Sequence, residues 1–264
     1  MVETTINYLR DMPERPYYYL YEPPIGEPWR NVCADARTVA IHDGRELPSA
    51  GSLDREGVTL VEHETAVEDL FDQRAIREVY YPEMEKLVAS ATGARRVFAF
   101  DHNLRSGPRA ERAQDLAEKP VRFAHNDYTE KSGPQRVRDL LPEDAEDLLR
   151  RRFAVINVWR PIRQPVLDTP LAVCDARSIG DGDLVQTELR YRDRTGEVYS
   201  LRWGASHRWI YFPRMQPNEA MLIKCYDSDR ERARFTAHSA FDDPTAPPDA
   251  PPRESIEART LAFF

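Results

Sequence analysis

The chain has few cysteines and no long uncharged apolar run. Its three cysteines, Cys33, Cys174 and Cys225, lie far apart among 264 residues and form no CxxC pair. This pattern indicates neither a disulfide framework nor a zinc-cysteine cluster and favours a reducing, cytoplasmic location. No segment is apolar enough to span a bilayer, and the charged start of the chain lacks the apolar part of a signal peptide. We therefore expect neither membrane insertion nor secretion.

An excess of basic residues is also missing. The 37 lysines and arginines are outnumbered by 45 acidic residues, which gives a formal net charge of -8, and a nucleic-acid partner is therefore not expected. The sequence has no phosphate-binding loop, dinucleotide fingerprint, nucleophile elbow or HExxH motif. Hydrolases and nucleotide-dependent enzymes are consequently poorly supported.

Short strand candidates fill the second half of the chain. Segments rich in β-branched and aromatic residues, separated by turn residues, lie at 153–159, 171–176, 183–191, 198–203, 208–212, 220–226, 235–240 and 255–264. Such spacing is typical of a β-sandwich or barrel. Because helical patterns precede the strands, we predict a mostly β fold with flanking helices, in which a double-layer barrel is buttressed by the helices.

The length fits one domain, 1–264, because β domains of this size are common as single units. We expect an extended arm and capping region over 1–60, helices plus the first core strands over 61–152, and the main β core over 153–264. The arm is rich in proline and tyrosine, which favours an extended conformation that covers the core or lines a pocket.

Local patterns refine the middle region. Apolar residues at helical spacing over 65–92 predict two helices broken near Pro82, and a similar pattern predicts helix over 132–151. Strands are predicted over 95–102 and 121–128.

The second of these strands carries the most informative motif, His125-Asn126-Asp127. Residues two apart in a strand point to the same face, so His125 and Asp127 can hold one ion from one side. A distant histidine would complete the set. Two histidines and one carboxylate on one face leave the opposite positions of iron(II) open for O2 and a chelating co-substrate.

The third ligand is predicted to be His238, which lies inside a candidate strand. His207 is the rival, but it begins a strand rather than lying inside one. A half-buried histidine bonded to the backbone is the ordinary alternative for His207.

The final strand supplies candidate groups for a co-substrate. Arg253, Ser255 and Glu257 share one face, so a guanidinium and a hydroxyl can meet one carboxylate of a dicarboxylate such as 2-oxoglutarate. Arg259 shares that face and is an alternative to Arg253. Asn157, in an otherwise apolar strand, is expected either to face the co-substrate or substrate or to bond a neighbouring strand or turn.

The chain resembles the hydroxylase/desaturase family of iron(II)/2-oxoglutarate-dependent oxygenases along nearly its whole length. The resemblance lies in the segments 79–83, 97–102, 125–129, 156–161, 171–177, 207–209, 224–228 and 252–257. One departure is Asn126, where an apolar residue would be expected and whose side chain should point away from the metal.

The resemblance implies a double-stranded β-helix (jelly-roll) core that uses Fe(II), 2-oxoglutarate and O2. It implies hydroxylation, desaturation or related C–H oxidation of a small specialised metabolite, with release of succinate and CO2. A small-molecule substrate is the expected partner, and a homodimer is a further expectation because the helices and the aromatic arm offer surfaces for one. The alternatives are an iron oxidase that does not use 2-oxoglutarate and a β-barrel small-molecule-binding protein with a lapsed metal site.

Overall fold

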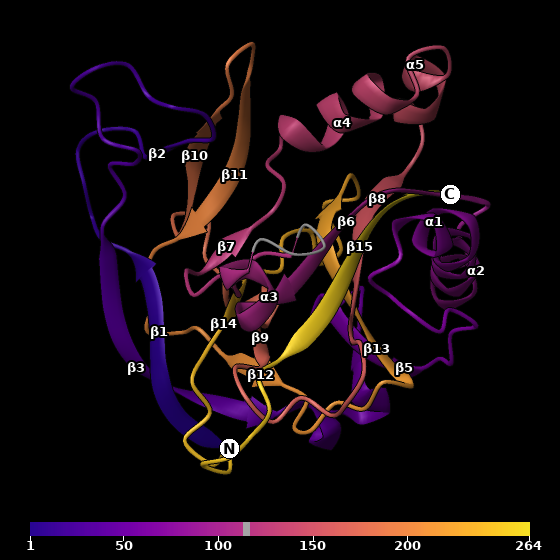
Figure 1. The fold of residues 1–264 in the computed structure, drawn as a ribbon. Helices are drawn as coiled ribbons and strands as arrows, with labels where there is room; N and C mark the ends of the chain where they lie inside the picture. The colour runs from indigo at the N-terminus through magenta and orange to yellow at the C-terminus, as the bar shows by residue number, and fades with distance from the viewer. Residues whose placement is uncertain (113–116) are drawn as a thin grey trace.

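The chain folds into two β-sheets that lie face to face, in a computed structural model that describes residues 1–112 and 117–264 (Figure 1). The nine-stranded sheet has the spatial order β1 (Val2–Leu9), β3 (Ala34–Asp43), β12 (Trp209–Tyr211), β9 (Leu171–Cys174), β14 (His238–Ala240), β7 (His125–Asn126), β11 (Thr195–Leu201), β10 (Leu184–Arg190) and β2 (Tyr17–Tyr19). The six-stranded sheet has the order β4 (Gly51–Ser52), β5 (Val58–Glu62), β13 (Glu219–Asp227), β8 (Phe153–Pro161), β15 (Glu254–Phe263) and β6 (Arg96–Ser106). Two curled, mostly antiparallel sheets confirm the predicted jelly-roll.

Helices are short and lie outside the two sheets. They are α1 (Gln73–Ala75), the π-helical turn η3 (Ile76–Tyr80), α2 (Tyr81–Thr92), α3 (Gly107–Glu111), α4 (Ser132–Leu140) and α5 (Ala145–Leu149), with 3-10 turns η1 (Gly44–Glu46), η2 (Pro48–Ala50) and η4 (Ala176–Ser178). The run from α1 to α2 buries Ile76, Met84 and Val88 against the outer face of the six-stranded sheet. It therefore covers the face that does not form the core between the sheets.

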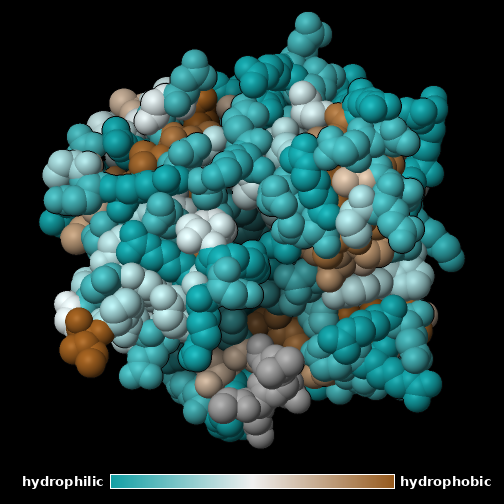
Figure 2. Space-filling view, turned by 90° about the horizontal axis from the view of Figure 1, so that it is seen from above, coloured by the Kyte–Doolittle hydropathy of each residue, from teal (hydrophilic) through white to brown (hydrophobic). Residues whose placement is uncertain are grey.

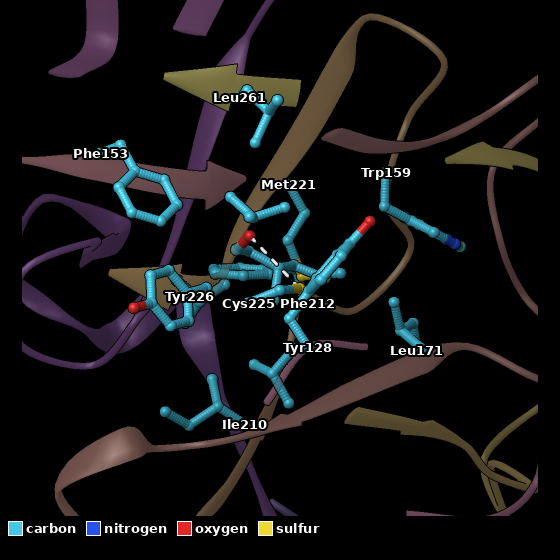
Figure 3. Packing of buried hydrophobic residues seen from close by; sticks show 14 of the residues in the cluster. Tyr128, Phe153, Trp159, Leu171, Ile210, Phe212, Met221, Cys225, Tyr226 and Leu261 are labelled. Atoms are coloured by element: carbon cyan, nitrogen blue, oxygen red, sulfur yellow. Dashed lines mark hydrogen bonds between the residues drawn. The ribbon is translucent and has the colours of Figure 1, made fainter. Parts of the chain in front are cut away.

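The core between the sheets is built from apolar side chains of both. Figure 3 shows Phe153, Trp159 and Leu261 from the six-stranded sheet together with Leu171 and Ile210 from the nine-stranded one. Alternation along the strands explains this arrangement, since every second residue points inward. Burial of so many large side chains, at about 25 cal/mol per Å² of apolar surface removed from water, is the main force that holds the sheets together.

All eight segments predicted as strands in the second half of the chain contain a strand, β8 to β15. Three other expectations differ in detail. The strand predicted over 121–128 is only β7, because pairing to β11 and β14 is confined to these two residues. The predicted break at Pro82 is not found, since α1, η3 and α2 form one continuous helical run in which the π-helical turn immediately precedes the turn that contains this proline. Residues 65–72 lie outside the helical run, which begins at α1.

The N-terminal region is extended, as expected, but it also belongs to a sheet. Strand β1 pairs antiparallel with β3, and β2 pairs parallel with β10 at the far edge of the nine-stranded sheet. Tyr17, Tyr19 and Tyr21 pack edge to face beside Arg190. The arm thus covers the β10 edge with aromatic side chains.

We predict that Gly57→Ala destabilises the protein by roughly 2 kcal/mol or more, because Gly57 adopts φ +81 and an added Cβ would clash with Thr236. Gly93→Ala is the matched control, since Gly93 also has positive φ (+73) but no heavy atom within 4 Å of the added Cβ. Its cost should be about 1 kcal/mol. Urea unfolding of both variants measures the difference, and equal free energies of unfolding would contradict the prediction.

Candidate metal centre

Three predicted metal ligands lie together in the middle of the nine-stranded sheet. The antiparallel register of β14 and β7 places His238 directly opposite His125, and Asp127 follows β7. One ligand atom of each residue lies within 4.8 Å of those of the other two, and His125 Nε2 is 3.6 Å from Asp127 Oδ1. Small side-chain rotations would therefore bring all three donors onto one ion.

Both imidazoles are oriented by backbone carbonyls. His125 Nδ1 lies 2.8 Å from the carbonyl oxygen of Phe123, and His238 Nδ1 lies 3.1 Å from that of Thr236. A ring nitrogen that faces a carbonyl must carry the proton, which leaves Nε2 of each ring as a lone-pair donor. Burial, together with the neighbouring His238, lowers the pKa of His125 to about 4. The ring is therefore neutral near pH 7, as a metal ligand must be.

Asp127 is held by two donors from the opposite sheet. Its Oδ2 accepts from Asn157 Nδ2 at 2.8 Å and from Arg259 Nε at 3.2 Å. Asn157 and Arg259 are themselves paired across β8 and β15. Burial raises the pKa of Asp127, but Arg259, the neighbouring His238 and His125 and the hydrogen bond from Asn157 together outweigh it, and the pKa lies below its ordinary value. The carboxylate is thus ionised, with Oδ1 turned toward His125.

Arg259 is the centre of a buried charge network. Beyond Asp127, its Nη1 donates to Asp101 at 2.8 Å, and its Nη2 lies 3.7 Å from Glu257. Burial and the nearby negative charge of Asp127 raise the pKa of Glu257. The alternative that Arg259 binds the co-substrate carboxylate conflicts with this arrangement, because its donors are already engaged with protein carboxylates.

A narrow space beside the three ligands, here called the inner cavity, has a volume of about 40 Å³. Its lining residues are Arg105, Val121, His125, Asp127, Trp159, Leu171, His238, Arg253, Glu257 and Arg259. Arg253 donates from Nη1 to the carbonyl oxygen of Thr169 at 2.7 Å and lies 5.5 Å above the Trp159 ring. Burial and Arg105 lower the pKa of Arg253 to about 9, so the guanidinium remains charged at neutral pH.

Three buried polar atoms near this cavity have no hydrogen-bond partner among the described residues. They are Arg253 Nε, Ser255 Oγ and Asn157 Oδ1. Unpaired buried donors and acceptors are costly, and each calls for an explanation such as a bound ligand. Ser255 is fully buried but is not among the residues that line the cavity.

A larger space of about 410 Å³, here called the outer cavity, adjoins the inner one. Its lining residues are Asp127, Tyr128, Lys131, Ser132, Gln135, Arg136, Asp139, Leu189, Tyr191, Arg194, Thr195, Gly196, Glu197, Val198 and Arg259. Asp127 and Arg259 line both cavities. Of the three candidate metal ligands, Asp127 therefore lies between the narrow inner cavity and the wider outer one.

His207, the rival for the third ligand, lies elsewhere. Its Nε2 is 3.0 Å from Asp183 Oδ2, and its ring stacks on Tyr8 with centroids 5.6 Å apart. It does not belong to the group formed by His125, Asp127 and His238. His207 therefore fits the ordinary alternative, a histidine whose hydrogen bonds are made within the protein. Its partners are side chains as well as backbone.

Sequence reasoning did not single out Arg105 or Glu257 as cavity residues and regarded Trp159 mainly as core. The period of two on β15 places Glu257 beside Arg253, which was the available signal. Arg105 lies opposite Ser255 only through the pairing of β6 with β15, and no local pattern indicates that register. Trp159 belongs to the core and also lines the inner cavity.

A jelly-roll with two histidines and one carboxylate at its centre defines the class of non-haem iron oxygenases. Comparison with known proteins agrees with this class. A family model described as "Oxidoreductase/YMDC permease-like domain" matches residues 6–263. The dioxygenase nvfI of Aspergillus novofumigatus is 34% identical over 93% of this chain and 90% of its own length. The hydroxylase/desaturase CTB9 of Cercospora beticola is 32% identical over 97% of this chain and 89% of its own.

A solved structure is similar over almost the whole chain. The iron and alpha-ketoglutarate-dependent endoperoxidase NvfI superimposes with a TM-score of 0.89 at 32% identity, covering 99% of this chain and 97% of that one. This chain belongs to the family of Fe(II)/2-oxoglutarate-dependent dioxygenases and hydroxylase/desaturases. It is an oxidoreductase that uses iron and 2-oxoglutarate, which favours the oxygenase over an oxidase without 2-oxoglutarate and over a binding protein.

Within residues 1–112 and 117–264, no helix is both long and apolar enough to cross a membrane.

We predict that Arg259→Gln weakens iron(II) affinity about 10- to 100-fold, because it removes a charged donor that orients Asp127. Anaerobic calorimetry with iron(II) measures the dissociation constant, and circular dichroism checks the fold. Arg136→Gln is the matched control, since Arg136 lines the outer cavity but is not among the residues that bond Asp127 and should leave the affinity unchanged. A folded Arg259→Gln variant with wild-type affinity would show that Arg259 does not position the ligand.

Proposed function

We propose that this chain oxidises a C–H bond of a small specialised metabolite, by hydroxylation, desaturation or a related reaction. In this proposal His125, Asp127 and His238 bind Fe(II), and Arg253 with Ser255 binds 2-oxoglutarate. The observation that carries it is the gathering of three ligand atoms within 4.8 Å beside a cavity in which a buried guanidinium has an unpaired Nε. A small-molecule substrate accords with the enzyme relatives.

The metal-binding residues fit a divalent ion. Each imidazole offers Nε2, and an ionised carboxylate offers Oδ1 while its Oδ2 is occupied by Asn157 and Arg259. When bound, iron and 2-oxoglutarate supply the activation of O2, in which 2-oxoglutarate becomes succinate and CO2. The role of the protein residues is to orient these groups and to limit the access of water.

The inner cavity fits one end of a dicarboxylate by charge, although it is small. Arg253 is buried and protonated, and its Nε lacks a partner among the described residues. A guanidinium can bind a carboxylate with two parallel hydrogen bonds, and the Ser255 hydroxyl can donate a third. Because the free volume is about 40 Å³, 2-oxoglutarate requires the lining side chains to shift. Release of the bond from Arg253 to Thr169 would supply such a shift.

Asn157 has an indirect role in this proposal. Its Nδ2 donates to Asp127, so it orients a metal ligand, while its unpaired Oδ1 remains for a water or a donor on a bound molecule. A direct contact between Asn157 and the co-substrate, a homodimer and a cytoplasmic location all stay predictions from the sequence.

The first test is an anaerobic titration of the apo-protein with iron(II) and then 2-oxoglutarate. We expect the weak visible charge-transfer band that forms when a 2-oxo acid chelates ferrous iron. His238→Ala should lose the band because it removes a ligand atom, whereas His207→Ala should keep it because His207 lies outside the group. The absence of a band despite bound iron would contradict the role of 2-oxoglutarate, and loss of the band only in a folded His207→Ala variant would reverse the choice of ligand.

A second test concerns Arg253. Arg253→Gln should raise the KM for 2-oxoglutarate about 10- to 100-fold, since loss of a charged hydrogen-bond donor costs roughly 1.5–3 kcal/mol, while iron affinity should change little. Ser255→Ala should give a smaller increase in the same direction. Succinate formation at varied 2-oxoglutarate concentration measures both. An unchanged KM in Arg253→Gln would exclude this arginine as the carboxylate-binding residue.

A further inference from the structure

The outer cavity opens between two separate parts of the chain. One wall is α4 with Lys131, and the other is the hairpin of β10 and β11, which stands beside α4 at the top of Figure 1. Asp127, Tyr128 and Arg259 form its floor. Figure 2, which looks down on this end of the molecule, shows a hollow in a largely hydrophilic face. A molecule in this cavity would therefore lie directly against the metal centre.

Most of the residues that line the outer cavity are polar or charged. Among the described residues that line it, Leu189 and Val198 are the aliphatic ones, and two tyrosines add aromatic surface. Ligand pockets usually combine a mainly apolar lining with a few polar groups that fix orientation. In this cavity polar and charged residues outnumber apolar ones, while apolar atoms still contribute slightly more of the exposed lining surface, so it suits a substrate that combines an apolar body with charged or hydrogen-bonding groups.

Carboxylates in the outer cavity already have partners. Glu197 accepts from Arg15 at 2.6 Å and from Thr129 at 3.2 Å. Asp139 accepts from Gln135 at 2.8 Å, and Asp127 belongs to the metal centre. Glu197 and Asp127 are thus paired with cations, whereas Asp139, among the described residues, bonds only a neutral amide and keeps its negative charge on the α4 wall.

Two arginines remain on the two walls. Arg136, on α4, lies 5.9 Å from the Phe100 ring centroid, and Arg194, on the hairpin, lies 4.0 Å from that of Tyr191. Neither guanidinium forms an ion pair with a carboxylate of the described residues. A guanidinium above a ring still presents its N–H donors at its edge. This pair forms a cationic entrance in a protein whose formal net charge is -8.

We propose that the substrate carries a carboxylate and that Arg136 and Arg194 bind it from opposite walls of the outer cavity. Guanidinium groups match carboxylates in shape and charge, and two of them hold an acid more firmly than a neutral analogue. The rest of the substrate then extends to the floor, beside Asp127. This inference rests on the proposed function, because it takes the outer cavity as the substrate site.

The test compares organic acids with their neutral methyl esters. Benzoate, cinnamate and 2-naphthoate and their esters are titrated by anaerobic calorimetry into the protein loaded with iron(II) and saturating 2-oxoglutarate, so that the co-substrate site is filled. We expect at least one acid to bind about tenfold more tightly than its ester. Equal binding of each acid and its ester, tighter binding of the esters, or no binding of any acid would overturn the proposal. Inorganic phosphate is a further probe, and binding of phosphate with none of the acids would overturn a carboxylate site.

Substitutions of the two wall arginines test whether the acid binds between the two walls. Arg136→Gln and Arg194→Gln should each lower acid affinity about 5- to 10-fold and leave ester affinity unchanged, and the double variant should lose the preference for the acid. Arg192→Gln is the matched control, because Arg192 is on the same hairpin but not in the lining of the cavity. Equal effects of Arg192→Gln and Arg194→Gln would overturn the assignment. The charge-transfer band is recorded before any acid is added. Its absence would show failure of the iron and 2-oxoglutarate assignments, separately from failure of the carboxylate site.

Discussion

The buried amide of Asn126 is the interaction that joins the segments that carry the three candidate metal ligands. Its Nδ2 donates to the carbonyl oxygens of Tyr128 and of Cys225 on β13, at 2.7 and 2.8 Å, and its Oδ1 accepts from the backbone N–H of Thr236 at 3.1 Å. This fully buried side chain therefore ties the short β7 segment to the other sheet and to the residues that lead into His238. An apolar side chain at 126 could pack there but could not make these bonds.

Buried charge is the second constraint on this part of the molecule. Asp127, Arg253, Glu257 and Arg259 lie close together where water is scarce, and burial of such charges is costly unless they are paired and hydrogen-bonded. Arg259 offsets much of the cost for two carboxylates at once. The result is a preorganised set of charges around Asp127, beside Arg253, whose Nε has no hydrogen-bond partner among the described residues.

Local sequence patterns predicted what depends on short-range geometry. The period of two identified the C-terminal strands and placed Arg253, Ser255 and Glu257 on one face, and the same rule joined His125 with Asp127. Contacts that depend on strand register could not be predicted from the sequence. The meeting of Asn157 and Arg259 on Asp127 requires β8 and β15 to align opposite a loop of the other sheet, which no segment of sequence specifies alone. The two-residue length of β7 is likewise set by its pairing with neighbouring strands.

Two walls of the outer cavity, α4 and the β10–β11 hairpin, lack candidate metal ligands, although β11 pairs with the strand β7 that carries His125. Helix α4 contacts β11, and α4 and the turn between β10 and β11 both line the cavity but contribute none of the three candidate ligand residues. Mutations in these walls could therefore accumulate over evolutionary time without loss of the oxidative chemistry. Such a division allows gene duplicates to diverge toward new metabolites, and it makes the helix and the hairpin turn the first places to randomise in directed evolution.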